Sequence, residues 1–270
     1  MRSPRRVTVL LALVAALVLV PVPALAGGVP RSNTPAGGVP RWNAPACGLH
    51  WVTIRTQLTY FHVYNDDFGR RTCVTAERYH PDFAVTSVER GFGFAAYPNI
   101  SSGWESGRYT CTGHTGACYS YPVQLRHDGD PRTSMSAWLA PGRYDLSWDI
   151  WTNRTNAHPV QGNGTELMIW LAHPGVPEGV IRTVTIDGIQ WNVTTWIAHR
   201  NGGRWRLLIY YSVRQRSSAY GLRLNDFFHE AERHHEMSAS YWLTGIDAGF
   251  ELVTGGLHNN IHYYSLTGVR

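Results

Sequence analysis

Two acidic stretches, Thr165–Leu171 and Ile246–Leu252, have residue types and spacing suited to acid–base or nucleophilic chemistry. Side chains on a strand alternate between two faces. That alternation gives one apolar face per stretch, formed by Leu167, Ile169 and Leu171 in the first and by Ile246, Ala248, Phe250 and Leu252 in the second. The other faces carry Glu166, Met168 and Trp170, and Asp247, Gly249 and Glu251. A carboxylate beside aromatic and sulfur groups is expected where a sugar ring is held and its glycosidic bond is attacked.

A third acid, Asp149, follows the same pattern within Leu146–Trp151. Alternation places it with Ser147 and Trp151, opposite an apolar face that includes Trp148. Acidic residues on strands usually point into solvent without any special role. Here, however, Trp or Met side chains share a face with the acids, which favours a functional site.

The rest of the chain predicts the framework that must position these acids. Short alternating runs recur at 59–64, 83–88, 121–125, 134–139, 146–151, 166–171, 180–186, 191–198, 204–213, 241–252 and 261–266. Gly, Asn, Asp and Pro separate them, which is typical of an all-β sandwich or barrel. One segment, Leu224–Glu236, has apolar residues at helical spacing, with Asn225 or Asp226 placed to cap it. We expect one helix packed on a sandwich, with Trp148 and Trp242 in its core.

The N-terminus predicts export. Residues 1–26 combine three arginines, an apolar run and an Ala-Leu-Ala end, the pattern of a secretory signal. A membrane anchor is the alternative, but proline interrupts the apolar run early. Residues 27–46 form a Gly- and Pro-rich near-repeat that reads as a flexible leader, so residues 47–270 are the predicted domain.

Charge and cysteine content narrow the class of protein. The net charge is +5 and falls to +2 without the three signal arginines, too mild to indicate nucleic-acid binding. Four cysteines in an exported chain favour two disulfides, for which three pairings are possible. Proximity in sequence suggests Cys47–Cys73 and Cys111–Cys118.

Both glutamate segments resemble those of glycoside hydrolase family 12, the small secreted endoglucanases. Residues 166–171 (Glu-Leu-Met-Ile-Trp-Leu) are similar to the segment with that family's nucleophile, and 248–252 (Ala-Gly-Phe-Glu-Leu) to the segment with its acid/base. Residues 147–151 (Ser-Trp-Asp-Ile-Trp) resemble its auxiliary-aspartate strand. Tyr97–Ile100 and Pro122–Leu125 also match in order.

This resemblance implies a fold and a set of roles. The fold would be a jelly-roll β-sandwich of two antiparallel sheets, with a concave substrate cleft and one packed α-helix. Glu166 would be the nucleophile, Glu251 the acid/base, and Asp149 a neighbour hydrogen-bonded to Glu166. Met168 and Trp170 would shape the cleft floor, and Trp151 is either a sugar contact or a packing residue. Cys47 and Cys73 match a family disulfide, and Cys111 and Cys118 resemble a second.

The chain departs from the family pattern at both edges of the expected cleft. The family's Asn-Asn-x-Trp-Gly corresponds to residues 65–69, so Asn65 is kept as a candidate substrate contact while Phe68 replaces a stacking tryptophan. Val253 stands where many members have another tryptophan, and the loop 101–120 is enlarged. A smaller ring weakens a stacking platform, which affects substrate preference more than chemistry.

Other chemistries fit poorly. His229-Glu230 lacks a histidine at 233, so the zinc motif H-E-x-x-H is incomplete. No G-x-S-x-G turn indicates an esterase. We therefore predict a secreted, monomeric, cofactor- and metal-independent retaining endo-β-1,4-glucanase, with no nucleic-acid partner and no membrane association once the signal is removed. Xyloglucan, mixed-linkage glucan or xylan specificity is the alternative within enzymes, and a non-catalytic carbohydrate-binding sandwich is the alternative outside them.

Overall fold

The computed structural model describes residues 45–48, 51–55, 60–76, 80–91, 93–105, 108–109, 121–156, 163–175, 179–200 and 203–269. The predicted signal (1–26) and the Cys111–Cys118 pair lie outside these residues, as does nearly all of the predicted leader. Its last residue, Ala46, already pairs with Val74 in the folded unit. The predicted disulfide between Cys47 and Cys73 is confirmed.

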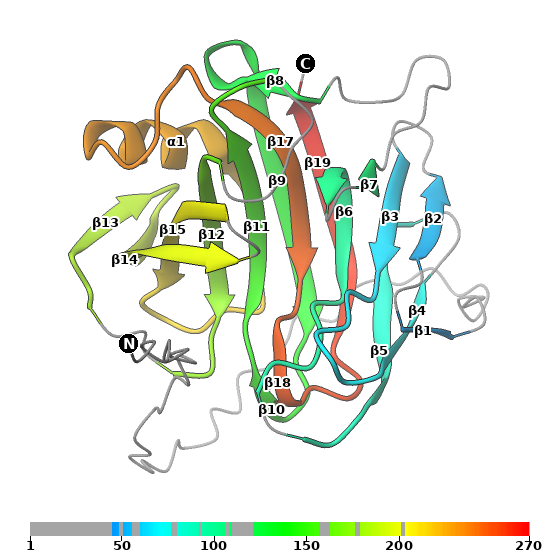
Figure 1. Ribbon diagram of the computed structural model, residues 1–270. Helices are drawn as coiled ribbons and strands as arrows, with labels where there is room; N and C mark the ends of the chain where they lie inside the picture. Colours follow the sequence, from blue (N-terminus) through cyan, green and yellow to red (C-terminus); the bar gives the residue numbers. More distant parts are fainter. Residues whose placement is uncertain are drawn as a thin grey trace, which may run out of the picture. The chain divides into compact units, whose positions relative to one another are not determined.

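The described chain forms two large sheets and one small one (Figure 1). In spatial order, the six-stranded sheet contains β1 (Ala46–Cys47), β4 (Thr72–Ala76), β5 (Phe83–Val88), β19 (Asn260–Val269), β9 (Gly129–Trp138) and β16 (Ser218–Arg223). The larger sheet contains β13 (Arg182–Ile186), β14 (Ile189–Arg200), β15 (Gly203–Ser212), β12 (Thr165–Ala172), β11 (Leu146–Asn153), β17 (Trp242–Gly249), β6 (Asn99–Glu105), β3 (Tyr60–Tyr64) and β2 (Trp51–Arg55). The short strands β7 (Arg108–Tyr109) and β8 (Val123–Gln124) pair with β6 and β17, and β10 (Gly142–Tyr144) with β18 (Leu252–Gly255). One 3₁₀ turn spans Leu125–His127.

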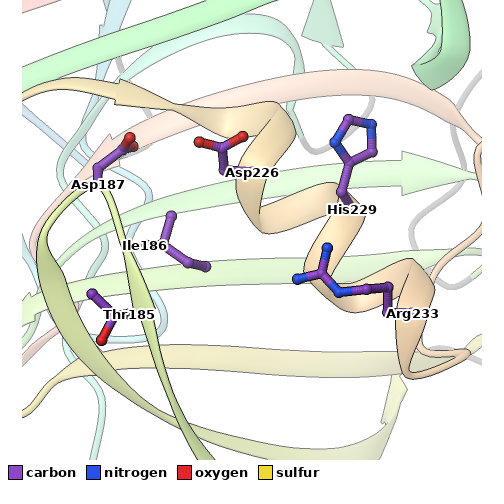
Figure 2. A pocket seen from close by; sticks show the side chains of 6 residues that line it. All are labelled: Thr185, Ile186, Asp187, Asp226, His229 and Arg233. Atoms are coloured by element: carbon purple, nitrogen blue, oxygen red, sulfur yellow. The ribbon is translucent and has the colours of Figure 1, made fainter.

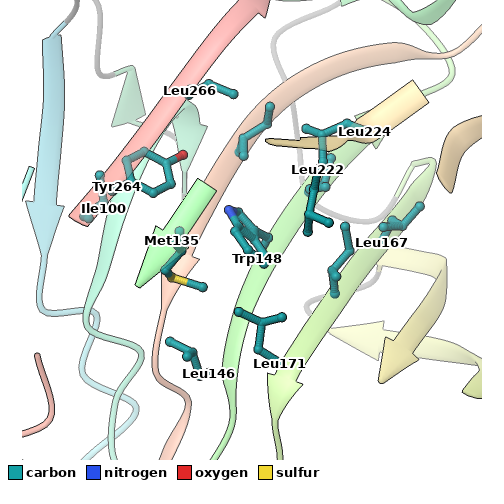
Figure 3. Packing of buried hydrophobic residues seen from close by; sticks show 14 of the residues in the cluster. Ile100, Met135, Leu146, Trp148, Leu167, Leu171, Leu222, Leu224, Tyr264 and Leu266 are labelled. Carbon is teal, nitrogen blue, oxygen red and sulfur yellow. The ribbon is translucent and has the colours of Figure 1, made fainter. Parts of the chain in front are cut away.

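A single apolar core lies between the two large sheets, as the alternation predicted (Figure 3). Its members come from both layers, for example Met135 on β9 and Leu167 on β12. Trp148 is fully buried in this core, and its indole N–H donates to Thr133 Oγ of the opposite sheet over 2.8 Å. The predicted all-β sandwich is therefore confirmed.

The prediction of purely antiparallel sheets was wrong at one place. Among the described strand pairs, only β12 and β15 run parallel, with Glu166 opposite Leu207. The reason is topological, because the hairpin β13–β14 fills the connection between them and returns the chain in its starting direction. This pairing brings β15 beside the strand that carries Glu166.

The single helix, α1 (Leu224–Arg233), packs against the β14–β15 end of the larger sheet (Figure 1). Phe227 contacts the rings of Trp191 and Tyr210 at centroid distances of 5.4 and 5.2 Å. The predicted caps were wrong, because Arg223 is the N-cap residue and Asn225 lies inside the first turn, where its amide donates to Gly129 O. The helix also ends before the predicted Glu236, since His235 has a positive φ of 57°.

The predicted run 241–252 is broken into β17 and β18. A register shift opposite Trp151 and Thr152 leaves Thr244 as an extra residue on β17. Leu243 thereby turns into the core and Trp242 does not, so the expected core position of Trp242 was wrong. No helix of the described residues has the length and apolarity needed to span a membrane.

Candidate active site

The three predicted acidic strands, β12, β11 and β17, are neighbours in the larger sheet. Asp149 on β11 lies opposite Met168 on one side and Asp247 on the other, and Trp151 lies opposite Glu166. The residues that alternate with these acids, such as Ile150, Leu167 and Ile246, all belong to the core. The acids therefore share the face of the sheet that points away from the core, as the sequence predicted.

Glu251 lies just beyond β17, where the backbone is held by several neighbours. Phe250 N donates to Pro98 O over 3.0 Å and Leu252 N to Ala96 O over 2.9 Å, while Asp145 N donates to the carbonyl of Glu251 over 3.3 Å. Gly249 makes this approach possible, because a Cβ there would lie 2.1 Å from Pro98 O. The glycine two residues before Glu251 is thus a packing requirement.

Burial raises the pKa values of Asp145, Asp149, Asp247 and Glu251. For Asp149, the charges of Glu166, Asp247 and Glu251 raise the pKa further. Both predicted catalytic glutamates are therefore close enough to act on the same aspartate. The Asp145 and Glu251 carboxyl groups are hydrogen-bonded to one another, and Ser147 Oγ donates to Asp145 Oδ1 over 2.6 Å.

The hydrogen bonds of Glu166 and Asp149 differ from expectation. The indole N–H of Trp205, on β15, donates to Glu166 Oε2. Asp149 Oδ2 accepts from Trp151 Nε1 over 3.0 Å, while its Oδ1 has no hydrogen-bond partner within the described chain. The predicted Asp149–Glu166 hydrogen bond was therefore wrong, although the charge of Glu166 still acts on Asp149.

The predicted floor residues lie on the acidic face. Met168 is buried there in a second apolar cluster with Ile209 and Tyr211, and the half-buried Trp170 packs against it. This small cluster is separate from the main core. Trp151 is half-buried and contacts the ring of Trp205 at 5.9 Å, so its printed contacts are with neighbouring protein groups. A concave cleft over this face stays a prediction.

The segment 65–69 contributes differently from the prediction. Asn65 is fully buried and its amide donates to the carbonyls of Gly48 and Thr72, which is at odds with a direct substrate contact. Phe68 is 37% exposed and its N–H donates to Ala95 O. Asp66 is the residue that acts on the site, because its charge raises the pKa of both Asp247 and Glu251, after the larger effect of burial.

Sequence reasoning missed Trp205, Asp145 and Asp66 as members of the site. Alternation along 204–213 puts Trp205 on one face with Ile209 and Tyr211, a signal that was available. What the sequence could not supply was the parallel register of β15 beside β12. Asp145 precedes its strand and Asp66 lies in a loop, so neither belongs to an alternating run.

A cavity of about 240 Å³ lies elsewhere, between the β13–β14 turn and α1 (Figure 2). Asp226, His229 and Arg233 line it from the helix, and Thr185, Ile186 and Asp187 from β13 and the turn. None of the predicted catalytic residues contributes to it. In the described part of the chain, no cluster of three or more His, Cys, Asp or Glu residues could hold a metal ion. The nearby His234 instead contacts Glu230, at 3.2 Å.

Comparison with known proteins agrees with this geometry. The sequence model described as Glycosyl hydrolase family 12 matches residues 95–267. The xyloglucan-specific endo-beta-1,4-glucanase A of Aspergillus niger is 25% identical over 205 residues, covering 72% of this chain and 79% of that protein. Endoglucanase cel12A from Rhodothermus marinus superimposes with a TM-score of 0.72 at 26% identity, over 83% of this chain and 98% of its own. A family 12 xyloglucanase from Bacillus licheniformis shares the fold, with a TM-score of 0.70 at 22% identity, over 84% and 100% of the two chains.

Proposed function

The chain belongs to glycosyl hydrolase family 12 and is an endo-β-1,4-glucanase, and we propose that it works by retaining double displacement, with Glu166 as nucleophile and Glu251 as acid/base. The observation that carries this proposal is the shared non-core face of β12, β11 and β17, with carboxyl groups on adjacent strands. Retaining enzymes of this type use two carboxyl groups about 5–5.5 Å apart on either side of the bond.

The environment of each glutamate supports its role. Glu166 is half-buried on a strand and receives a hydrogen bond from a neutral donor, Trp205, which favours an ionised carboxylate ready to attack. Burial and the charge of Asp66 raise the pKa of Glu251, which favours the protonated form that a general acid requires. The two carboxyl groups thus differ in the direction that the mechanism needs.

In the first step, one oxygen of Glu166 bonds to the anomeric carbon and the glycosidic C–O bond breaks. The leaving oxygen takes the proton of Glu251. In the second step, water attacks the anomeric carbon of the glycosyl ester, gives its proton to Glu251 and releases Glu166. Asp149 would limit the spread of charge between the two glutamates, because its own pKa is raised by both.

β-1,4-Glucan is the proposed substrate, and xyloglucan is the second candidate because the curated relatives are named for it. The replacement of expected tryptophans by Phe68 and Val253 points the same way, since smaller side chains leave room beside the main chain. Mixed-linkage glucan and xylan remain for the substrate panel.

We propose that the enzyme acts outside the cell as a monomer and without a cofactor. The signal-like residues 1–26 and the Cys47–Cys73 disulfide support export, because disulfides persist in oxidising compartments.

The test is release of reducing ends from carboxymethylcellulose, followed by xyloglucan, barley glucan and xylan. Glu166→Gln and Glu251→Gln should each lose nearly all activity while staying folded, and the exposed Glu89→Gln should not. Binding of glucan by the wild-type chain without any hydrolysis would instead favour a non-catalytic sandwich.

A further inference from the structure

Trp205 occupies a position that no general feature of the core requires. It lies on β15, which runs parallel to β12 with Arg206 opposite Thr165 and Leu207 opposite Glu166. Alternation puts Trp205 on the acidic face, together with Ile209 and Tyr211, whereas Leu208 and Tyr210 enter the main core. The side chain is only 8% exposed, so it is held by the protein.

The indole of Trp205 points its only polar atom at Glu166. The N–H donates to Glu166 Oε2, and an indole has no acceptor lone pair with which to bind a protonated carboxyl group. A hydrogen bond to an ionised group is about twice as strong as one between neutral groups. The contact therefore favours one rotamer of Glu166 and its charged state, without introducing a cation.

A second indole links this contact to the neighbouring acid. The Trp151 and Trp205 rings lie 5.9 Å apart at an interplanar angle of 53°, and Trp151 Nε1 donates to Asp149 Oδ2. Two touching indoles thus each donate one hydrogen bond to one of two adjacent carboxylates. A shift of either ring would move both acids, so the arrangement resists independent rotation of Glu166.

We propose that Trp205 is a positioning residue for Glu166, an inference that rests on Glu166 being the nucleophile. It binds Oε2 and leaves Oε1 free to bond to the anomeric carbon. When that bond forms and the glycosidic C–O bond breaks, the negative charge of Glu166 is lost and Oε2 becomes the ester carbonyl, which still accepts the indole N–H. The donor therefore fixes the carboxylate before attack and the ester before hydrolysis.

The experiment compares Trp205→Phe, Trp205→His and a matched control. Trp205→Phe keeps an aromatic ring and removes the donor, whereas Trp205→His supplies an N–H on a smaller ring. Trp191→Phe makes the same chemical change at another buried tryptophan, whose indole donates to Ile186 O far from the acids. Folding is checked by circular dichroism and thermal unfolding.

Steady-state kinetics on an aryl β-cellobioside give the main result. Trp205→Phe should lower kcat by about 100-fold, because a small misplacement of a reacting group has an effect of that order. KM should change by less than about threefold, since the interaction acts on the reacting centre. Trp205→His should recover at least about tenfold of the lost kcat, and Trp191→Phe should retain wild-type kcat.

A 2-deoxy-2-fluoro aryl cellobioside separates this inference from the function on which it rests. Mass spectrometry of the trapped wild-type enzyme should find the sugar on Glu166, and Trp205→Phe should be labelled at the same residue but more slowly. A label on another residue overturns both the nucleophile assignment and the role of Trp205. A label on Glu166 with unchanged rate and kcat in Trp205→Phe overturns the role of Trp205 alone, as does equal loss of kcat in Trp205→Phe and Trp191→Phe. Should Trp205→Phe fail to fold, Trp205→His decides by its kcat at unchanged KM.

Discussion

Two groups of buried acids in this protein are treated in opposite ways. The helix cluster consists of Glu230, Glu236, Arg182 and Tyr210, where α1 meets β13 and β15. The cleft cluster consists of Asp145, Asp149, Asp247, Glu166 and Glu251, on and beside β11, β12 and β17. Both sets are carboxylates held near or below the protein surface, so their differences must come from the partners around them.

In the helix cluster a cation compensates the acids. Arg182 Nε lies 2.7 Å from Glu230 Oε1 and its Nη2 lies 2.5 Å from Glu236 Oε2, and Tyr210 also donates to Glu230. Burial alone would raise the pKa of Glu230, but the hydrogen bonds from Arg182 and Tyr210 lower it below its ordinary value. These acids join the helix to the sheet and stay charged.

In the cleft cluster the perturbing charges are those of other acids. Burial and neighbouring carboxylates raise the pKa of Asp149, and burial followed by the charge of Glu251 does so for Asp145. Such an arrangement costs folding free energy when the acids ionise. The contrast teaches that compensation identifies a structural contact here, while its absence identifies groups kept for proton and glycosyl transfer.

The two clusters also predict opposite pH dependence of stability. The folded-state pKa of Glu230 is lowered, so its contribution is present above the unfolded carboxylate pKa and is lost as pH falls through the folded value. In the cleft cluster the folded-state values are raised, so the native state holds more protons and stability declines as pH rises above the unfolded pKa.

The largest expected effect separates the clusters by activity. Glu251→Gln should reduce hydrolysis of an unactivated glucan by at least about 10³-fold, because it removes the general acid, yet leave stability at pH 7 unchanged or higher. Glu230→Gln should weaken folding and keep the kcat of the folded fraction. Reducing-end assays and urea unfolding measure the two. Equal loss of kcat in both variants would remove the distinction.

Removing the compensating cation should have the next largest effect. Arg182→Gln leaves Glu230 and Glu236 without their guanidinium partner and should lower the free energy of unfolding by about 3 kcal/mol. Arg132→Gln breaks an exposed pair with Asp130 and should lower it by less than about 1 kcal/mol. Urea unfolding at pH 7 compares them, and similar values would show that Arg182 does not stabilise the helix cluster.

Neutralising one acid of the cleft cluster should stabilise the protein. Asp247→Asn removes a buried charge whose pKa is raised by burial, so we expect a gain of about 1–2 kcal/mol at pH 8 and almost none at pH 4, where the aspartate is protonated. Unfolding in urea at both pH values tests this. A gain of the same size at pH 4 would mean that packing rather than charge is responsible.

The smallest effect should appear in the pH profile. Burial raises the pKa of Glu251, and the charge of Asp66 raises it further, so Asp66→Asn should lower that pKa and move the alkaline limb of kcat/KM down by about 0.5 unit. Asp226→Asn, on the first turn of α1, should leave the limb in place. A shift to higher pH in Asp66→Asn would contradict the sign of this coupling.

Local alternation made much of this structure predictable. Glu166, Asp149 and Asp247 were assigned to the non-core face from sequence because each lies in a regular strand whose alternate residues are apolar. Trp242 escaped this rule because Thr244 adds one residue to β17, and a single extra residue exchanges the faces beyond it.

The remaining features depend on contacts between distant segments. Asn65 was assigned to substrate from its motif, but its amide is satisfied by carbonyls beside the Cys47–Cys73 disulfide. The contact of Trp205 with Glu166 depends on the parallel pairing of β15 with β12 across an intervening hairpin. Sequence reveals which residues share a face, whereas partner strand and register are fixed by the packing of the whole sheet.

The central claim is that Glu166 and Glu251 cooperate on one glycosidic bond through a glycosyl-enzyme ester. Proton NMR of a soluble cello-oligosaccharide during the first moments of hydrolysis reports the anomeric configuration of the new reducing end before mutarotation. Double displacement predicts the β-anomer first, because two inversions restore the original configuration. Appearance of the α-anomer first would show a single displacement by water and contradict the assignment of Glu166 as nucleophile.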